Sequence, residues 1–342
     1  MGSVTDGASF RVDPSMFDGR YSTPRSVYGD LERVVRADLQ YHYSTPICAQ
    51  RWLDVCEDPA YGHDALLRRI TEVFPGLVDA LVADRGGVAG LAVTSLGPGD
   101  GSIDQRVLQA IDRSVGVHSY RALDFSFELL RRAVHRIAHT GDFRQPFPID
   151  AVCGDFTDVA GLRGVIADSD AARLFLLTGL TLGNYAEDRL VRQVREGLMS
   201  PGDYLLVDGR SHGLDPARSA SSFTVEERGD LTRSYDLETV RRFVLGPLEI
   251  ATAAGGHEIE IGYDIDRGLT TVPGAWNIVI HARDLESTMR LTGTPVRRAR
   301  LDLAVTTLYH TSSLGAWFPS QGFEVVWEDS RDGTSFFLLR CG

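Results

Sequence analysis

Short apolar runs and amphipathic segments alternate in a regular order through the middle of the chain. The runs at Gly90–Leu96, Tyr120–Asp124, Ile149–Cys153, Arg173–Thr178 and Tyr204–Asp208 are typical of buried strands. Between them, apolar residues mostly recur at the spacing of one helical face. Apolar strands that alternate with amphipathic helices predict an α/β fold with a doubly wound parallel sheet covered on both faces.

The flanking regions break this alternation. Residues 27–74 show helical spacing, and we expect their last helix to stop at Pro75-Gly76. The stretch 210–308 combines a long helical segment near Leu237–Ala254 with strand-like runs. The tail, residues 323–339, reads as two strands joined by a turn and predicts a closing β-hairpin.

These breaks predict two domains and a short arm. Residues 1–9 are expected to form an arm or a disordered segment. We expect residues 10–64 and 213–308 to form a second, substrate-binding α+β domain, made of the N-terminal helices and an insertion after the fifth strand. Residues 65–212 and 309–342 are expected to form a Rossmann-like cofactor-binding domain.

Composition favours a small-molecule partner. The 342 residues carry a formal net charge of −12, and every basic side chain is arginine. Nucleic acids and anionic membranes are bound through clustered basic charge, so neither is expected as a partner. The N-terminal residues lack the pattern of a signal peptide, and no apolar run is long enough to span a bilayer, so we expect a cytoplasmic protein. The oligomeric state is left open.

The four cysteines do not have metal-binding spacing. Cys48, Cys56, Cys153 and Cys341 form no CxxC pair, and no histidine lies at zinc-finger distance from them. We expect free structural thiols in a reducing compartment and no metal site.

A glycine-rich loop follows the first central strand. Gly97, Gly99 and Gly101 lie where missing side chains let a ligand approach the backbone and the start of the next helix. A tight strand-to-helix turn would use the same residues, so the loop alone leaves both interpretations open.

Acidic and aromatic residues at the next two strand ends favour a nucleotide-like ligand. Asp124 is placed to accept ribose hydroxyls, and Asp155-Phe156 to contact an adenine ring. Asp124 could instead cap a helix. The loop lacks the GxGxxG spacing of dinucleotide-binding proteins. The closing hairpin also fits the seven-stranded sheet of class I S-adenosylmethionine methyltransferases, so we expect S-adenosyl-L-methionine as cofactor and S-adenosyl-L-homocysteine as product.

Two motifs carry a more specific resemblance. Leu176–Tyr185, LLTGLTLGNY, and Ser200–Asp208, SPGDYLLVD, resemble the histidine-specific methyltransferase family. Tyr41–Tyr43 and Asp58–Tyr61 are similar to its N-terminal stretch. That family makes trimethylhistidine for ergothioneine and includes relatives that act on tryptophan-derived amines. It combines a catalytic Rossmann domain with a second domain.

The resemblance implies roles for seven residues. Two lie in the turn after the fourth central strand and are expected to bind the cofactor, namely Thr178 and Gly179. The others are expected to hold the substrate, in most cases its α-amino and carboxylate groups, namely Tyr43, Tyr61, Asn184, Tyr235 and Thr306. An amide and phenols can bind a zwitterion without adding net charge. Each tyrosine could instead pack in a core or an interface with its hydroxyl satisfied locally.

One departure argues against histidine as the substrate. In the stretch Leu303–Tyr309, Ala304 stands where the family has the acidic residue that pairs with imidazole, although Thr306 keeps a hydroxyl. We therefore predict N-methyl transfer to another amino-acid-like substrate, in specialised metabolism, with no catalytic residue identified. Two alternatives stay open: transfer of the aminocarboxypropyl group or cyclisation with the same cofactor, and a non-catalytic binding protein that keeps the fold.

Overall fold

The computed structural model describes residues 8–13, 39–87, 90–158, 162, 171–252, 259–283 and 300–342. Within these residues, the strands form a continuous sheet whose order is β1-β4-β3-β2-β5-β6-β9-β8-β7. Two further strands lie off this path: β11 pairs with β6, and β10 pairs with β11. The strands are β1 (Ala8–Val12), β2 (Leu91–Leu96), β3 (Val117–Asp124), β4 (Ile149–Cys153), β5 (Ala172–Leu177), β6 (Tyr204–His212), β7 (Glu260–Asp266), β8 (Trp276–Arg283), β9 (Arg300–His310), β10 (Phe323–Arg331) and β11 (Thr334–Cys341).

The central strands have the order of a class I methyltransferase. Strands β4, β3, β2, β5 and β6 are parallel, whereas β11 runs antiparallel to β6 and is followed by β10. The winding direction changes between β2 and β5, where doubly wound sheets open a ligand crevice. The predicted fold class is therefore confirmed. The closing hairpin is also confirmed, with Asp332 and Gly333 at positive φ in its two-residue turn.

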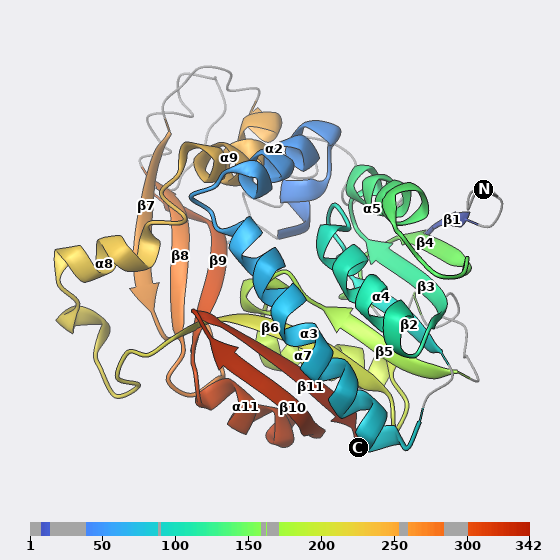
Figure 1. Cartoon of the computed structure of the whole chain (residues 1–342). Helices are drawn as coiled ribbons and strands as arrows, with labels where there is room; N and C mark the ends of the chain where they lie inside the picture. The colour runs from blue at the N-terminus through green and yellow to red at the C-terminus, as the bar shows by residue number, and fades with distance from the viewer. Residues whose placement is uncertain are drawn as a thin grey trace.

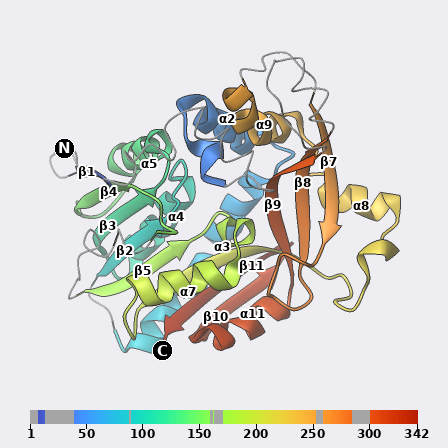
Figure 2. The ribbon, with the colours of Figure 1, turned by 180° about the vertical axis from the view of Figure 1, so that it is seen from behind.

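Helices cover both faces of the central sheet. Figures 1 and 2, which view the molecule from opposite sides, show α3, α4 and α5 on one face and α7 and α11 on the other. The α-helices are α2 (Pro46–Glu57), α3 (His63–Arg85), α4 (Ser102–Ser114), α5 (Phe127–Thr140), α7 (Glu187–Leu198), α8 (Val225–Thr232), α9 (Glu238–Thr252) and α11 (Ser313–Trp317). The 3-10 helices are η3 (Leu39–Tyr43), η4 (Thr181–Asn184), η5 (Ala220–Ser222) and η6 (Phe318–Gln321).

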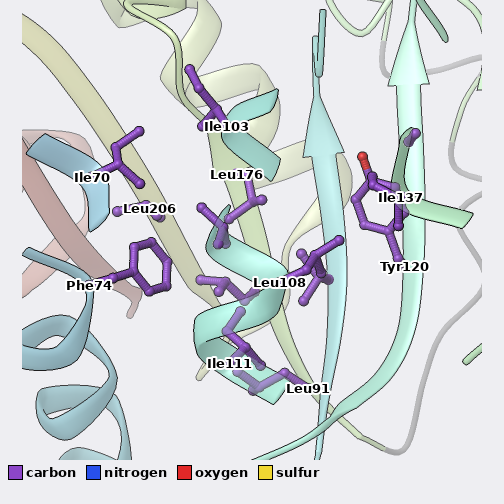
Figure 3. Packing of buried hydrophobic residues seen from close by; sticks show 14 of the residues in the cluster. Ile70, Phe74, Leu91, Ile103, Leu108, Ile111, Tyr120, Ile137, Leu176 and Leu206 are labelled. Carbon is purple, nitrogen blue, oxygen red and sulfur yellow. The ribbon is translucent and has the colours of Figure 1, made fainter. Parts of the chain in front are cut away.

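Alternate side chains of the central strands pack into two separate hydrophobic cores, one on each face of the sheet. On β5, Leu174 and Leu176 join the core under α3, α4 and α5, whereas Phe175 and Leu177 join the core under α7. This is the two-residue period of a strand buried on both faces. Figure 3 shows the first core, in which Phe74 of α3 lies close to Leu206 of β6. The apolar runs in the sequence reflect this double burial.

The sequence-based end of α3 is wrong. The helix continues through Pro75 to Arg85 rather than stopping at Pro75-Gly76. Leu77 and Leu81 of the extra turns are almost fully buried against the sheet, and this burial offsets the hydrogen bond that proline removes. At Gly76, a Cβ would lie 3.6 Å from the Trp327 indole nitrogen, so β10 packs directly against this part of the helix.

A third hydrophobic core lies between α2, α9 and the strands β7, β8 and β9. It occupies the stretches where the second domain is predicted, and the domain boundaries stay predictions. One difference is clear: Ala8–Val12, expected partly in the arm and partly in the second domain, pairs in parallel with β4 at the edge of the central sheet. The expected arm at 1–7 and the first predicted N-terminal helix before residue 39 lie outside the described residues.

Candidate active site

A cavity opens at the carboxyl ends of the parallel strands and encloses about 1050 Å³, including its mouth. Its wall combines strand-end loops of the central sheet with η3, α2, α3 and η4. The lining residues are Leu39, Gln40, Tyr43, Trp52, Cys56, Tyr61, Gly62, His63, Leu66, Gly97, Pro98, Gly99, Asp100, Ser102, Ile103, Asp104, Asp124, Phe125, Leu129, Asp155, Phe156, Thr178, Gly179, Leu180, Thr181, Asn184, Tyr185 and Arg210.

The glycine loop between β2 and α4 brings bare backbone to this wall. Gly97 and Gly99 have φ values of 79° and 58°, in the left-handed region that glycine adopts without strain. A Cβ on Gly97 would lie 3.3 Å from the Phe156 ring, and one on Gly99 would lie 3.7 Å from the Trp52 indole nitrogen. A side chain at Gly97 would crowd the Phe156 ring, whereas the first carbon of one at Gly99 would make an ordinary contact with Trp52.

Asp124 at the end of β3 is a buried acceptor. Its carboxylate accepts hydrogen bonds from the backbone amides of Gly99, at 3.2 Å, and Ser126, at 2.8 Å. Burial raises the pKa of Asp124 to about 7, and these two amides oppose that rise. A carboxylate has about four acceptor positions, so hydroxyls of a bound ligand can still be accommodated.

The end of β4 supplies the next predicted pair. Asp155 is buried and accepts hydrogen bonds from the Thr157 backbone amide and hydroxyl and from the Gln40 side chain. The adjacent Phe156 ring meets Tyr185 edge-on, with ring centroids 5.7 Å apart. The end of β4 therefore contributes one polar and one aromatic side chain to the cavity wall.

The turn after β5 carries Thr178, Gly179 and, at the end of η4, Asn184 to the cavity. A fully buried carboxylate, Asp208 of β6, fixes this turn by accepting the amides of Gly179, at 2.9 Å, and Leu180, at 2.8 Å. Leu180 has a φ of 64°, which is unfavourable for a branched side chain. Burial raises the pKa of Asp208 to about 7. Its role is to hold the strained turn in place.

Aromatic rings form a row along the cavity wall, called here the aromatic row: Tyr43, then Trp52 beside the glycine loop, then Tyr61. The Trp52 ring lies 5.8 Å from that of Tyr43 and 6.0 Å from that of Tyr61, both edge-on. Burial raises the pKa of Tyr43 well above its usual value and also raises that of Tyr61. Both phenols therefore stay neutral and can donate or accept hydrogen bonds.

Arg210 of β6 places a positively charged side chain next to Tyr61 of the aromatic row. Its guanidinium carbon lies 5.9 Å from the centre of the Tyr61 ring and 5.1 Å from that of Tyr235. One guanidinium nitrogen donates to the Ser234 hydroxyl at 2.6 Å. Arg210 is the only arginine among the described residues that line the cavity.

The structure brings most of the predicted site residues together. All seven predicted cofactor-binding residues line the cavity, as do Tyr43, Tyr61 and Asn184. Tyr235 is buried behind Arg210 and does not line it. Thr306 lies outside the lining as well: its hydroxyl is beside Gly183, at the back of η4.

Sequence reasoning missed several residues of the wall. Trp52 was assigned only to the apolar face of a helix, and Arg210 was given no role, although both line the cavity. His63 also lines the cavity, with its Nε2 3.1 Å from the Ser102 hydroxyl at the start of α4, and burial lowers the pKa of its imidazole. Arg210 lies two residues beyond Asp208 on the same strand, which is the one local signal that could have indicated it.

Neither a metal centre nor a membrane-spanning helix is found in the described residues. No group of three or more histidine, cysteine or acidic side chains is placed to hold a metal ion there. None of the helices in the described ranges is both long and apolar enough to cross a bilayer. All four cysteines are free.

The residues that line the cavity suit S-adenosylmethionine in their shape and hydrogen-bonding groups. A backbone cradle without side chains at Gly97 and Gly99 lies beside a buried carboxylate, Asp124, that can accept hydroxyl groups. Phe156 supplies an aromatic face or edge at the same end. This is the donor and acceptor set that a nucleoside needs at the end of a doubly wound sheet.

Three solved structures show a partial likeness to this chain. A SAM-dependent methyltransferase from Methanosarcina mazei shares 14% identity over 73% of this chain and 92% of its own, with a TM-score of 0.37. The protein of a DhpI-SAH complex shares 13% over 86% and 97%, with a TM-score of 0.38. The O-methyltransferase NcsB1 from neocarzinostatin biosynthesis shares 14% over 96% and 72%, with a TM-score of 0.39.

No curated protein matches the chain. The model of a family described as histidine-specific, SAM-dependent methyltransferases matches residues 52–250, more than half of the sequence. This match covers both motifs that carry the resemblance, LLTGLTLGNY and SPGDYLLVD. The chain therefore belongs to the SAM-dependent histidine-specific methyltransferase family, and its cofactor is S-adenosylmethionine.

Proposed function

We propose that this protein transfers a methyl group from S-adenosylmethionine to an amine of a small amino-acid-like substrate other than histidine, in specialised metabolism in the cytoplasm. One observation carries the proposal. The glycine loop and Asp124 share a single cavity with Tyr43, Tyr61 and Asn184, so a cofactor and a zwitterionic acceptor can meet in one enclosed space.

The cofactor would occupy the end formed by the strand tips. Asp124 would accept the ribose hydroxyls, Asp155 and Phe156 would contact the adenine, and the backbone at Gly97 and Gly99 would lie against the amino-acid part. Thr178 and Gly179 would close this end from the side of β5. When bound, the cofactor supplies an electrophilic methyl group on a leaving group that is already good.

The acceptor would lie against the aromatic row and Asn184. The Asn184 amide and the neutral phenols of Tyr43 and Tyr61 can donate to a carboxylate and accept from an amine. Tyr235 would act on this group through Arg210, whose guanidinium it flanks. Thr306 has no direct part, because it lies outside the lining.

The chemistry needs an unprotonated amine held in line. Apolar walls lower the pKa of an amine by disfavouring its charged form, and Tyr43, Trp52 and Phe156 supply such walls here. Their rings can also stabilise positive charge by about 0.5–2 kcal/mol each. The methylated ammonium can release its proton to water through the cavity mouth, so no protein base is invoked.

The substitution of the acidic residue supports a substrate other than histidine. Ala304 lies on β9 opposite Ile280 of β8 and packs against the third hydrophobic core. An alanine offers no charge to pair with an imidazole.

The test is methyl transfer to a panel of amino acids. The protein is incubated with methyl-labelled S-adenosylmethionine and each of the twenty amino acids, with arginine and the aromatic amino acids first, and the products are identified by mass. We expect S-adenosylhomocysteine together with a non-histidine amino acid that gains the labelled methyl on nitrogen. Methylthioadenosine would instead indicate aminocarboxypropyl transfer or cyclisation. Exclusive methylation of histidine, or failure to bind the cofactor, would contradict the proposal.

A further inference from the structure

Arg210 differs from two other partly buried arginines, Arg173 and Arg340, in what surrounds it. Arg173 is held by Asp203, and Arg340 by Asp84. For Arg210, no carboxylate of the described residues lies within ion-pairing distance. Its neighbours are two phenol rings and one serine hydroxyl. An arginine in the wall of a cavity without a carboxylate partner is positioned to receive one from a ligand.

The neighbours of the Arg210 guanidinium favour its charged form and hold it in position. Tyr61 and Tyr235 lie within cation–π distance of it, and the hydrogen bond to Ser234 occupies only one nitrogen. A guanidinium has five N–H donors in a planar fork, so donors remain for a ligand. Such a fork matches the two oxygens of a carboxylate.

We propose that Arg210 binds a carboxylate of the methyl acceptor, with Tyr61 and Tyr235 holding the guanidinium in the cavity wall. This deepens the proposed function and rests on it, because it names the anionic group by which the acceptor is selected. The acceptor end would then bind an amino acid in preference to the amine that lacks its carboxylate. Asn184 and Tyr43 would be left for the amine.

The charge distribution of the wall supports this orientation. Four lining carboxylates, Asp100, Asp104, Asp124 and Asp155, come from the loops and helix starts of the central sheet, whereas Arg210 lies beyond the aromatic row. A carboxylate at Arg210 would meet opposite charge in a partly desolvated site. Electrostatics thus favours placing the acceptor carboxylate at Arg210.

The first test needs no turnover. The S-adenosylhomocysteine-loaded protein, labelled at its arginine guanidinium groups, is titrated with sodium propionate and followed by nuclear magnetic resonance. The Arg210 signal is assigned by its loss in Arg210→Lys. We expect this signal to shift saturably with propionate and to stay unchanged at the same concentration of sodium chloride. No saturable shift at this signal would overturn the proposal.

The second test compares acids with their amides. For any amino acid that the panel identifies, the KM of the acid is compared with that of its carboxamide, in the wild-type protein and in Arg210→Gln. We expect the wild type to favour the acid, and Arg210→Gln to raise the KM of the acid about tenfold to a hundredfold while leaving the amide nearly unchanged. Arg210→Lys should fall between them, because lysine keeps the charge without the fork.

Controls separate this proposal from a folding defect and from the proposed function. Arg233→Gln removes an exposed neighbouring arginine and should change neither measurement. Unchanged S-adenosylhomocysteine affinity in the Arg210 variants shows that they are folded. If propionate binds but no amino acid is methylated, the proposed function fails and this inference stands. An equal loss for acid and amide in Arg210→Gln would overturn the inference and leave methyl transfer intact.

Discussion

The two ends of the cavity are built from different parts of the chain. At the cofactor end, backbone amides and the carboxylate of Asp124 come from consecutive strand tips of the parallel sheet. At the acceptor end, the aromatic row comes from η3, α2 and the turn before α3, which follow one another in the sequence, whereas Arg210 comes from the distant β6. Backbone and sheet order fix the first end, whereas side-chain packing fixes the second.

This difference indicates which end can change without loss of the fold. The glycine loop and the turn held by Asp208 depend on backbone conformations that few residues adopt. The acceptor end depends on rings and on one guanidinium, and such side chains can be exchanged while the sheet stays intact.

The largest expected effect is at Asp124. Asp124→Ala should weaken the affinity for S-adenosylhomocysteine by a hundredfold or more, because two hydrogen bonds to a charged acceptor are lost, each worth about 1.5–3 kcal/mol. Calorimetric titration measures this. The matched control is Asp150→Ala on β4, a carboxylate outside the cavity that pairs with Arg121. Equal affinities in wild type and Asp124→Ala would show that this end does not bind the ribose.

The next effect concerns the glycine loop. Two glycine-to-alanine variants separate the cost of a left-handed backbone conformation from the cost of steric crowding. At Gly101, with a φ of 77°, a Cβ would lie 2.7 Å from the Ala133 Cα of α5. Gly101→Ala should lower the free energy of unfolding by about 2–5 kcal/mol, from left-handed strain and overpacking. Gly116, just beyond the other end of α4, also has positive φ but open space around its Cβ. Gly116→Ala should cost about 1–2 kcal/mol. Equal losses in denaturant titrations would contradict the close packing of α4 on α5.

The pH dependence of cofactor affinity sharpens the comparison further. Burial holds the pKa of Asp124 at about 7 in the free protein, and ribose hydroxyls donating to the carboxylate would lower it. Binding therefore releases a proton below pH 7, so affinity for S-adenosylhomocysteine should rise with pH up to about 7, by at most tenfold per pH unit, and then level off. Asp124→Asn should remove most of this slope. A wild-type affinity that is flat between pH 5 and 8 would contradict the assignment.

The smallest effect is expected at Thr306. Because this residue lies behind Gly183 and outside the lining, Thr306→Ala should change the KM of the methyl acceptor by less than about twofold. Asn184→Ala, on the cavity side of the same 3-10 helix, should raise it about tenfold or more through the loss of hydrogen bonds to the acceptor. Steady-state kinetics decide between them. A larger effect at Thr306 than at Asn184 would mean that the acceptor extends toward β9.

How far the sequence predicted the site follows the same division. The glycine loop, Asp124 and Asp155-Phe156 were predictable, because apolar runs place the strand ends and parallel strand ends meet at one edge. Tyr43, Tyr61 and Asn184 were found through the resemblance, not through any periodicity. Trp52 and Arg210 were missed, because their side chains reach the cavity only through packing between elements that sequence spacing does not relate.

The errors in the fold have local physical causes. Because proline usually ends a helix, α3 was predicted to stop at Pro75. The burial of Leu77 and Leu81 against the sheet outweighs the hydrogen bond that Pro75 removes, and the helix continues. Ala8–Val12 was assigned away from the central sheet, since polar residues around it mask its strand pattern. The first case shows tertiary burial overriding a local signal, whereas the second shows backbone pairing at a sheet edge whose side chains stay largely exposed.

The most direct test of the division between the two ends is a crystal structure grown with S-adenosylhomocysteine. We expect density for its ribose against Asp124, for its adenine beside Phe156, and for its amino-acid part along Gly97 and Gly99, with the space between the aromatic row and Arg210 left for the acceptor. A nucleoside bound at Arg210, or no contact with Asp124, would contradict the account.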